Sequence, residues 1–128
     1  MSFNARFVAT LPAADLARAK AWYADKLGLN PSAEFPGGMN YTTRGGEFAL
    51  YETMFAGTAQ NTAATWMAED FDAAVADLRA RGVGFEEYDM PGLTTDDGVA
   101  TDPDGFKAAW FKDSEGNIHG LVQSRPGM

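Results

Sequence analysis

The spacing of apolar residues predicts a strand followed by a helix at the start of the chain. Residues 3–11 predict the strand, because large apolar residues there are separated by small ones. Asp15 is typical of a helix start, since its side chain can accept from the free backbone N–H groups of the first turn. An apolar stripe at helical spacing follows at Leu16, Ala19, Tyr23 and Leu27. Gly28 ends this helix because glycine adopts the left-handed conformation without steric cost.

Three short strands are predicted next, at residues 32–36, 39–44 and 47–54. Glycine pairs at 37–38 and 45–46 separate them, and paired glycines between short alternating runs are typical of hairpins.

The second half of the chain repeats this order. A strand is predicted at 62–68 and a helix from Asp70 to Gly82, followed by strands near 83–87, 98–102, 106–112 and 117–123. The two helix-start aspartates lie 55 residues apart and the two helix-ending glycines 54 apart, which indicates an internal repeat. Because one unit buries only one face of its sheet, we expect the units 1–55 and 62–128 to pack together into a single α+β domain, 1–128.

Charge and composition exclude several kinds of function. The chain carries 18 acidic and 10 basic residues, and its net charge of −8 argues against nucleic acid and anionic membrane surfaces as partners. No cysteine is present, which excludes disulfides, thiolate metal sites and cysteine nucleophiles. No apolar run is long enough for a membrane span and no secretory signal pattern is visible, so a cytoplasmic location is expected.

Three motifs together resemble the vicinal oxygen chelate superfamily, which includes glyoxalase I, the bleomycin-resistance proteins and the extradiol dioxygenases. The first helix carries Asp15-Leu16, Trp22-Tyr23 and Leu27-Gly28, and the second ends in residues 78–83. Residues 113–117 resemble the turn of that superfamily, with Ser114 in place of its usual proline. The resemblance implies two βαβββ modules forming a half-open barrel, and a homodimer.

The metal-using members of that superfamily hold a divalent ion with four side chains on the concave face. By resemblance these positions fall on Val8, Ala49, Ala63 or Ala64, and Gly120, none of which can bind a metal. A shift of one residue in strand 47–54 would bring in Glu52 alone. We therefore predict no metal and no cofactor, as in the bleomycin-resistance proteins, which bind a bulky ligand at a dimer interface and perform no chemistry.

The leading hypothesis is a protein that sequesters or carries an aromatic or amphipathic metabolite in a metal-free cavity. Its predicted ligand-binding residues are apolar positions and aromatic residues with polar groups, which small-molecule cavities favour: Val8, Thr10, Tyr41, Ala49, Tyr51, Tyr88, Trp110 and Gly120. The register of residues 106–112 leaves the face of Trp110 open. Trp22 and Trp66 fit structural positions between helix and sheet.

Two alternatives remain open. One is a glyoxalase- or dioxygenase-like enzyme, a lyase or oxidoreductase, in which Glu52 is the best candidate for a general base. The other is a partner-binding module that uses the irregular loop 88–98.

Two further groups of residues are interpreted as structural. His119, the only histidine, alternates with Gly120 and is expected to be half-buried and hydrogen-bonded on the face towards a helix. Residues 102–105 (Asp-Pro-Asp-Gly) are typical of a β-turn, and their spacing with Asp96 and Asp97 does not match a calcium loop.

Overall fold

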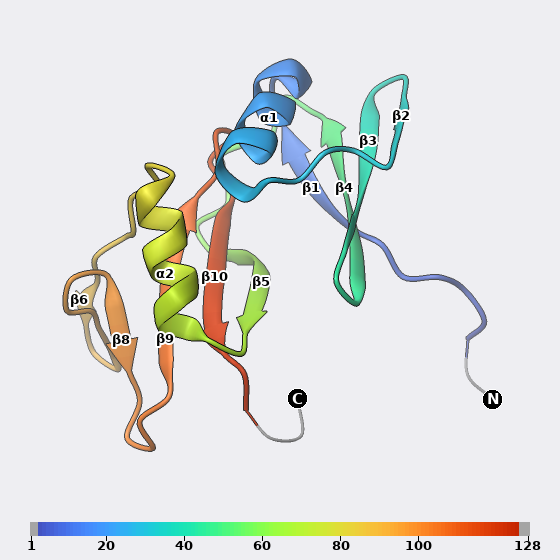
Figure 1. Ribbon diagram of the computed structural model, residues 1–128. Helices are drawn as coiled ribbons and strands as arrows, with labels where there is room; N and C mark the ends of the chain where they lie inside the picture. Colours follow the sequence, from blue (N-terminus) through green and yellow to red (C-terminus); the bar gives the residue numbers. More distant parts are fainter. Residues whose placement is uncertain (1–2, 126–128) are drawn as a thin grey trace.

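Two four-stranded sheets, each with its own helix, make up the architecture of the computed structural model, which describes residues 3–125 (Figure 1). The first sheet has the order β1-β4-β3-β2, with β1 (Ala9–Ala13), β2 (Ala33–Phe35), β3 (Gly38–Thr43) and β4 (Gly46–Glu52). The second has the order β5-β10-β9-β8, with β5 (Thr62–Ala68), β8 (Val99–Thr101), β9 (Lys107–Lys112) and β10 (Ile118–Gln123). Each sheet has one parallel pair, β1 with β4 and β5 with β10, and its other pairs are antiparallel.

The helices follow the first strand of each unit. Helix α1 (Leu16–Trp22) continues into a π-helical turn, η1 (Tyr23–Leu27), and α2 spans Phe71–Ala80. The predicted α+β class with two βαβββ units is confirmed, and the two sheets are separate rather than closed into one barrel. No helix within residues 3–125 is both long and apolar enough to cross a membrane.

The predicted helix ends are confirmed. Asp15 accepts a hydrogen bond from the Arg18 backbone at 3.0 Å, and Asp70 accepts one from the Ala73 backbone at 3.1 Å. Gly28 and Gly82 both adopt a positive φ, 68° and 86° respectively. Local sequence signals therefore fix where both helices begin and end.

One predicted strand begins later than expected, since only residues 9–11 of the predicted 3–11 lie in β1, and the predicted strand 83–87 is wrong. Residues 3–8 form no strand, and this segment leads away from the body of the molecule with Phe3 92% and Phe7 84% exposed (Figure 1). Residues 83–87 supply only an isolated bridge between Phe85 and Phe111. Residues 83–87 form no longer strand because β8 already pairs with residues 107–109 of β9, so only the last residues of β9 are left to pair with them.

The loop 88–98, predicted to be irregular, contains a short hairpin. Its strands are β6 (Asp89–Met90) and β7 (Leu93–Thr94), joined through Pro91 and Gly92. Gly92 has a φ of 82°, which suits a tight turn after proline.

Two apolar cores share residues at the junction of the modules. The first lies between α1, η1 and the first sheet, and the second between α2 and the second sheet. Trp22, Leu27 and Trp66 pack against both. The Trp22 ring stacks 6.2 Å from Phe111, and Trp66 meets Phe48 edge-on at 6.0 Å, so the structural interpretation of both tryptophans is confirmed.

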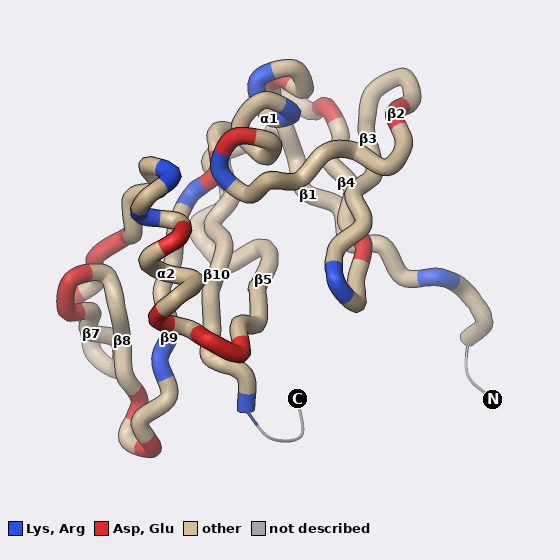
Figure 2. Tube along the Cα trace, in the orientation of Figure 1, with Lys and Arg blue, Asp and Glu red and all other residues tan. Residues whose placement is uncertain are grey.

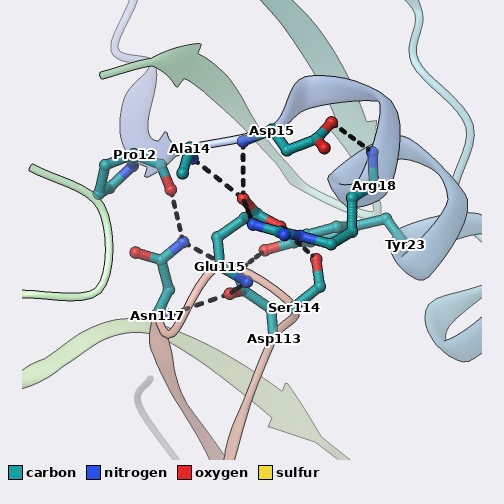
Figure 3. Close-up of polar contacts among 9 residues, drawn as sticks. All are labelled: Pro12, Ala14, Asp15, Arg18, Tyr23, Asp113, Ser114, Glu115 and Asn117. Carbon is teal, nitrogen blue, oxygen red and sulfur yellow. Dashed lines mark hydrogen bonds and ion pairs between the residues drawn. The ribbon is translucent and has the colours of Figure 1, made fainter. Parts of the chain in front are cut away.

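Hydrogen bonds and an ion pair join the turn between β9 and β10 to the first module (Figure 3). The buried Glu115 carboxylate accepts hydrogen bonds from the backbone N–H groups of Ala14 and Asp15, each at 2.9 Å, and from the Arg18 guanidinium. Asn117 donates its amide to the Pro12 carbonyl at 2.9 Å. Burial raises the pKa of Glu115, but the hydrogen bonds from Arg18, Ser114 and Asp15 outweigh this and hold the pKa below its usual range.

His119 lies in a second polar network that is fully buried, rather than half-buried as predicted. Trp66 Nε1 donates to His119 Nδ1 at 3.0 Å. Because an indole nitrogen only donates, the proton of the neutral imidazole lies on Nε2, which faces Asp113 Oδ2 at 3.1 Å and Tyr23 Oη at 3.0 Å. The predicted orientation towards a helix is correct, since Tyr23 belongs to η1.

Candidate ligand-binding cleft

The faces of the second sheet can be assigned from its register. Phe111 and His119 pair with each other on the side of the helices, where both are fully buried. Their neighbours Trp110 and Gly120 also pair, and therefore face the opposite, concave side. This register settles the orientation of Trp110 that the sequence left open.

A cleft of about 390 Å³ lies on this concave side. Ala100, Ala108 and Val122 lie in one row across β8, β9 and β10 and form its floor. The hairpin residues 92–94 line it as well, and its aromatic residues are Trp110 and Phe106. The small side chains of the floor leave a flat apolar surface three strands wide.

Trp110 is held in place from two directions. The Tyr88 ring meets it edge-on with centroids 5.5 Å apart. On the other side lies Gly120, where an added Cβ would stand 3.6 Å from Trp110 Nε1 and 3.3 Å from Thr65 Oγ1. Trp110 and Thr65 thus take up the space that a longer side chain at position 120 would need.

The residues at the four positions of the superfamily's metal site do not fit a divalent ion. Val8 precedes β1, Ala49 lies in the middle of β4, and Gly120 is covered as described above. On β5, Ala63 is skipped by the pairing with β10, and Ala64 packs against the first core. None of these side chains offers a donor atom, and residues 3–125 contain no group of three or more His, Cys, Asp or Glu side chains arranged to hold a metal.

Of the predicted ligand-binding residues, only Trp110 lines this cleft. Tyr88 supports Trp110 from behind. Thr10, Ala49 and Tyr51 share the face of the first sheet that is opposite its helix, and Tyr51 is 43% exposed there. Val8 precedes that sheet, and Gly120 lies beneath Trp110.

The placement of Tyr41 on the concave face is wrong. Tyr41 pairs with Phe48 on the helix side of the first sheet, and the two rings stack 4.8 Å apart. Tyr41 is 1% exposed, and burial together with Glu34 raises its pKa to about 12. It belongs to the core because Met39 and Tyr41 alternate with the polar residues Asn40 and Thr42.

Glu52 does not occupy an apolar cavity. This candidate general base lies exposed at the end of β4, opposite Ala13, as a surface residue at a strand end. Asp102 forms the predicted β-turn: its carboxylate accepts from the backbone N–H groups of Asp104 and Phe106, and Gly105 N donates to the Asp102 carbonyl.

Sequence reasoning missed most of the cleft. Ala108 and Phe106 follow from Trp110 by alternation once its face is known, but no local signal points to Leu93 or Arg125. It also missed the buried role of Asp113, although its place in the turn motif was noted.

The family model of the Glyoxalase/Bleomycin resistance protein/Dioxygenase superfamily matches residues 6–109. The chain belongs to this superfamily. Solved structures of low sequence identity show the same fold. No curated protein gives a significant match to the chain.

Three of these superfamily structures cover nearly the whole chain. A bleomycin-binding protein complexed with bleomycin has a TM-score of 0.72 and 15% identity, covering 95% of this chain and all of its own. Lactoylglutathione lyase from Agrobacterium tumefaciens has a TM-score of 0.71 and 18% identity, with coverage of 97% and 96%. A glyoxalase/bleomycin resistance protein/dioxygenase from Nocardioides has a TM-score of 0.67 and 21% identity, with coverage of 100% and 88%.

Proposed function

We propose that this member of the superfamily is a metal-independent binding protein that sequesters or carries an aromatic or amphipathic metabolite, acting in the cytoplasm. The observation that carries the proposal is the concave cleft, with its flat apolar floor and the Trp110 ring beside it. Cavities of a few hundred Å³ with apolar walls and a few polar groups are typical of small-molecule sites. The bleomycin complex of a structural neighbour is consistent with this kind of function.

Metal independence is supported by the chemistry of the superfamily's ligand positions. Valine, alanine and glycine stand where the ion would need nitrogen or oxygen donors. The contacts around Gly120 also oppose any larger residue at that position. The ligand would then be bound through shape, ring contacts and hydrogen bonds.

An enzymatic function finds less support in the cleft. Its titratable side chains are Asp102, Lys107 and Arg125. Asp102 and Arg125 pair with each other, and Lys107 pairs with Asp72 of α2. None is an unpaired group suited to remove or deliver a proton. The hairpin in loop 88–98 lines the cleft, which favours a role in ligand binding over one in docking a protein partner.

A homodimer is part of the proposal. Phe3 and Phe7 near the start of the chain are almost fully exposed, and Met54 and Phe55 after β4 are 87% and 69% exposed. Large apolar side chains this exposed favour burial against another surface. Light scattering behind size exclusion tests this directly: a dimer is expected, and a monomer at micromolar concentration contradicts it.

A thermal-shift screen tests the binding function. Monocyclic and bicyclic aromatic compounds are expected to raise the melting temperature in chelator-treated protein, because a ligand that binds only the native state stabilises it. Trp110→Ala should remove the shift, whereas Tyr51→Ala, an exposed aromatic outside the cleft, should retain it. A shift produced by divalent metals alone, at near-stoichiometric binding, would contradict the proposal and favour the enzyme.

A further inference from the structure

The floor of the cleft selects for a flat ligand. Ala100, Ala108 and Val122 are direct neighbours across three strands. With strands about 4.8 Å apart, this row is roughly 10 Å wide, which is comparable with two fused aromatic rings. The hairpin residue Leu93 lies against the same cleft, so the space favours a planar molecule over a globular one.

A cation lies near the Phe106 end of the cleft. The Arg125 guanidinium stands over the Phe106 ring, with 4.2 Å between its central carbon and the ring centroid. It also forms an ion pair with Asp102. Arg125 and Phe106 both line the cleft, and Figure 2 shows a basic segment where the chain leaves β10. A guanidinium held by a ring and a carboxylate is preorganised to bind a further group.

Asp102 positions Arg125 without using up its donors. One oxygen of Asp102 accepts the backbone N–H groups of Asp104 and Phe106, and the other accepts from a single terminal nitrogen of Arg125. Arginine has five N–H donors, and the Arg125 side chain is 41% exposed. Within residues 3–125 the remaining donors make no other hydrogen bond, so they can bind an anionic oxygen in the charge-assisted geometry that arginine favours.

The other cation that lines the cleft does not offer an equal site for an anion. Lys107 is directed to the helix side, where it pairs with Asp72 at 3.0 Å. A cationic ligand would have to displace Arg125 from both Asp102 and the Phe106 ring before it reached a carboxylate. The chain's net charge of −8 acts over longer distances and is screened by salt, so the contact at Arg125 decides the preference.

We propose that the ligand is a planar aromatic anion, with its rings on the floor beside Trp110 and its anionic group bound by Arg125. This inference rests on the proposed binding function and deepens it by naming the ligand class.

Three naphthalene probes of nearly equal shape test the ligand class. They are 2-naphthoate, 2-naphthamide and 2-naphthamidine, which carry an anionic, a neutral and a cationic group. Calorimetric titration of the full chain is expected to show 2-naphthoate binding at least about tenfold more tightly than the amide, since a charge-assisted hydrogen bond to arginine is about twice as strong as a neutral one. The amidine should bind most weakly.

Two variants test whether Arg125 is the source of the preference for the anion. Arg125→Gln should reduce the preference of naphthoate over naphthamide to about twofold or less. Lys112→Gln removes a cation at the far end of β9, one that pairs with Glu86 and does not line the cleft, and should leave the preference intact. Equal binding of the anion and the amide by the wild type, tighter binding of the amidine, or an unchanged preference in Arg125→Gln would each overturn the inference.

Trp110→Ala distinguishes failure of the ligand class from failure of the site. If Trp110→Ala weakens all three probes but the wild type shows no anion preference, the ligand class is wrong and the site stands. If Trp110→Ala binds every probe as the wild type does, or if no probe binds the wild type, the proposed function fails with the inference. Unchanged melting curves for each variant establish that it is folded.

Discussion

The Tyr23 hydroxyl donates to Asp113 Oδ2 at 2.5 Å, and this buried hydrogen bond joins the first helical segment to the turn between β9 and β10 (Figure 3). Burial and the neighbouring carboxylate raise the pKa of Tyr23 far above its usual range, so the phenol remains protonated. Burial also raises the pKa of Asp113, but hydrogen bonds from His119, Tyr23 and Asn117 outweigh it and hold the pKa below its usual range.

Asp113→Asn is expected to lower the free energy of unfolding at pH 7 by about 2–4 kcal/mol, because buried donors lose their charged acceptor. The folded-state pKa of Asp113 is lower than the unfolded-state value of about 3.9. Its contribution to stability is therefore complete above about pH 5 and is lost as the pH falls through the folded-state pKa. Urea unfolding across acid pH should show a shallower decline for Asp113→Asn than for the wild type. The exposed Asp104→Asn is the control, and an equal decline in Asp113→Asn and the wild type would contradict the assignment.

The hydrogen bond from Trp66 to His119 can be tested with the variant Trp66→Phe for its contribution to stability, and with NMR for its direction. The variant keeps an aromatic ring but leaves the buried His119 Nδ1 without its donor, at an expected cost of about 1–3 kcal/mol in unfolding free energy. Nitrogen NMR of the wild type should identify the tautomer protonated at Nε2. A proton on Nδ1 in the wild type would show that the network is arranged differently.

Glu115→Gln should destabilise the chain by about 2–4 kcal/mol, because the buried carboxylate serves two backbone N–H groups and Arg18 together. Arg18→Gln should have a smaller effect, since its side chain is half exposed and water can replace its contact. Chemical denaturation of both variants measures the difference. An equal or larger loss in Arg18→Gln would mean that the ion pair, rather than the helix start, is the main stabilising contact.

Gly120→Ala is expected to lower the free energy of unfolding by about 1 kcal/mol or less, because the new Cβ would lie 3.3 Å from Thr65 Oγ1, a tight contact, and at an ordinary 3.4 Å from Thr62 Cγ2. Thr65→Ala removes the closest of these atoms. In a double-mutant cycle, Gly120→Ala should therefore cost less in the Thr65→Ala background than in the wild type. Strict additivity of the two changes would show that position 120 has room for a side chain.

The repeat, both helix starts and the superfamily could be predicted because they depend on short-range signals: Asp15 and Asp70 act within one turn, and Gly28 and Gly82 act at a single φ angle. The error at Tyr41 has a different cause. An aromatic residue with a hydroxyl suits a cavity as well as a core, and the alternation with Asn40 and Thr42, which favours the core, was outweighed by the expectation of an aromatic cavity.

The cleft itself depends on long-range packing. In β9 both faces are apolar, with Ala108 and Trp110 on one and Ala109 and Phe111 on the other, so alternation alone cannot assign Trp110. Residues 92–94 of the hairpin line the cleft together with Val122 of β10, which is distant in the sequence. Phe106 lies just before β9 and Arg125 just after β10. Their contact forms only because these two strands pair, so no local sequence pattern predicts it.

Calorimetric titration of chelator-treated protein with the tightest-binding naphthalene probe tests the central claim, that the concave cleft binds an aromatic molecule beside Trp110 without a metal. The account predicts the same affinity before and after addition of Zn²⁺, Ni²⁺, Fe²⁺ or Mn²⁺, and loss of binding in Trp110→Ala. Binding that requires one of these ions, or that survives unchanged in Trp110→Ala, would contradict it.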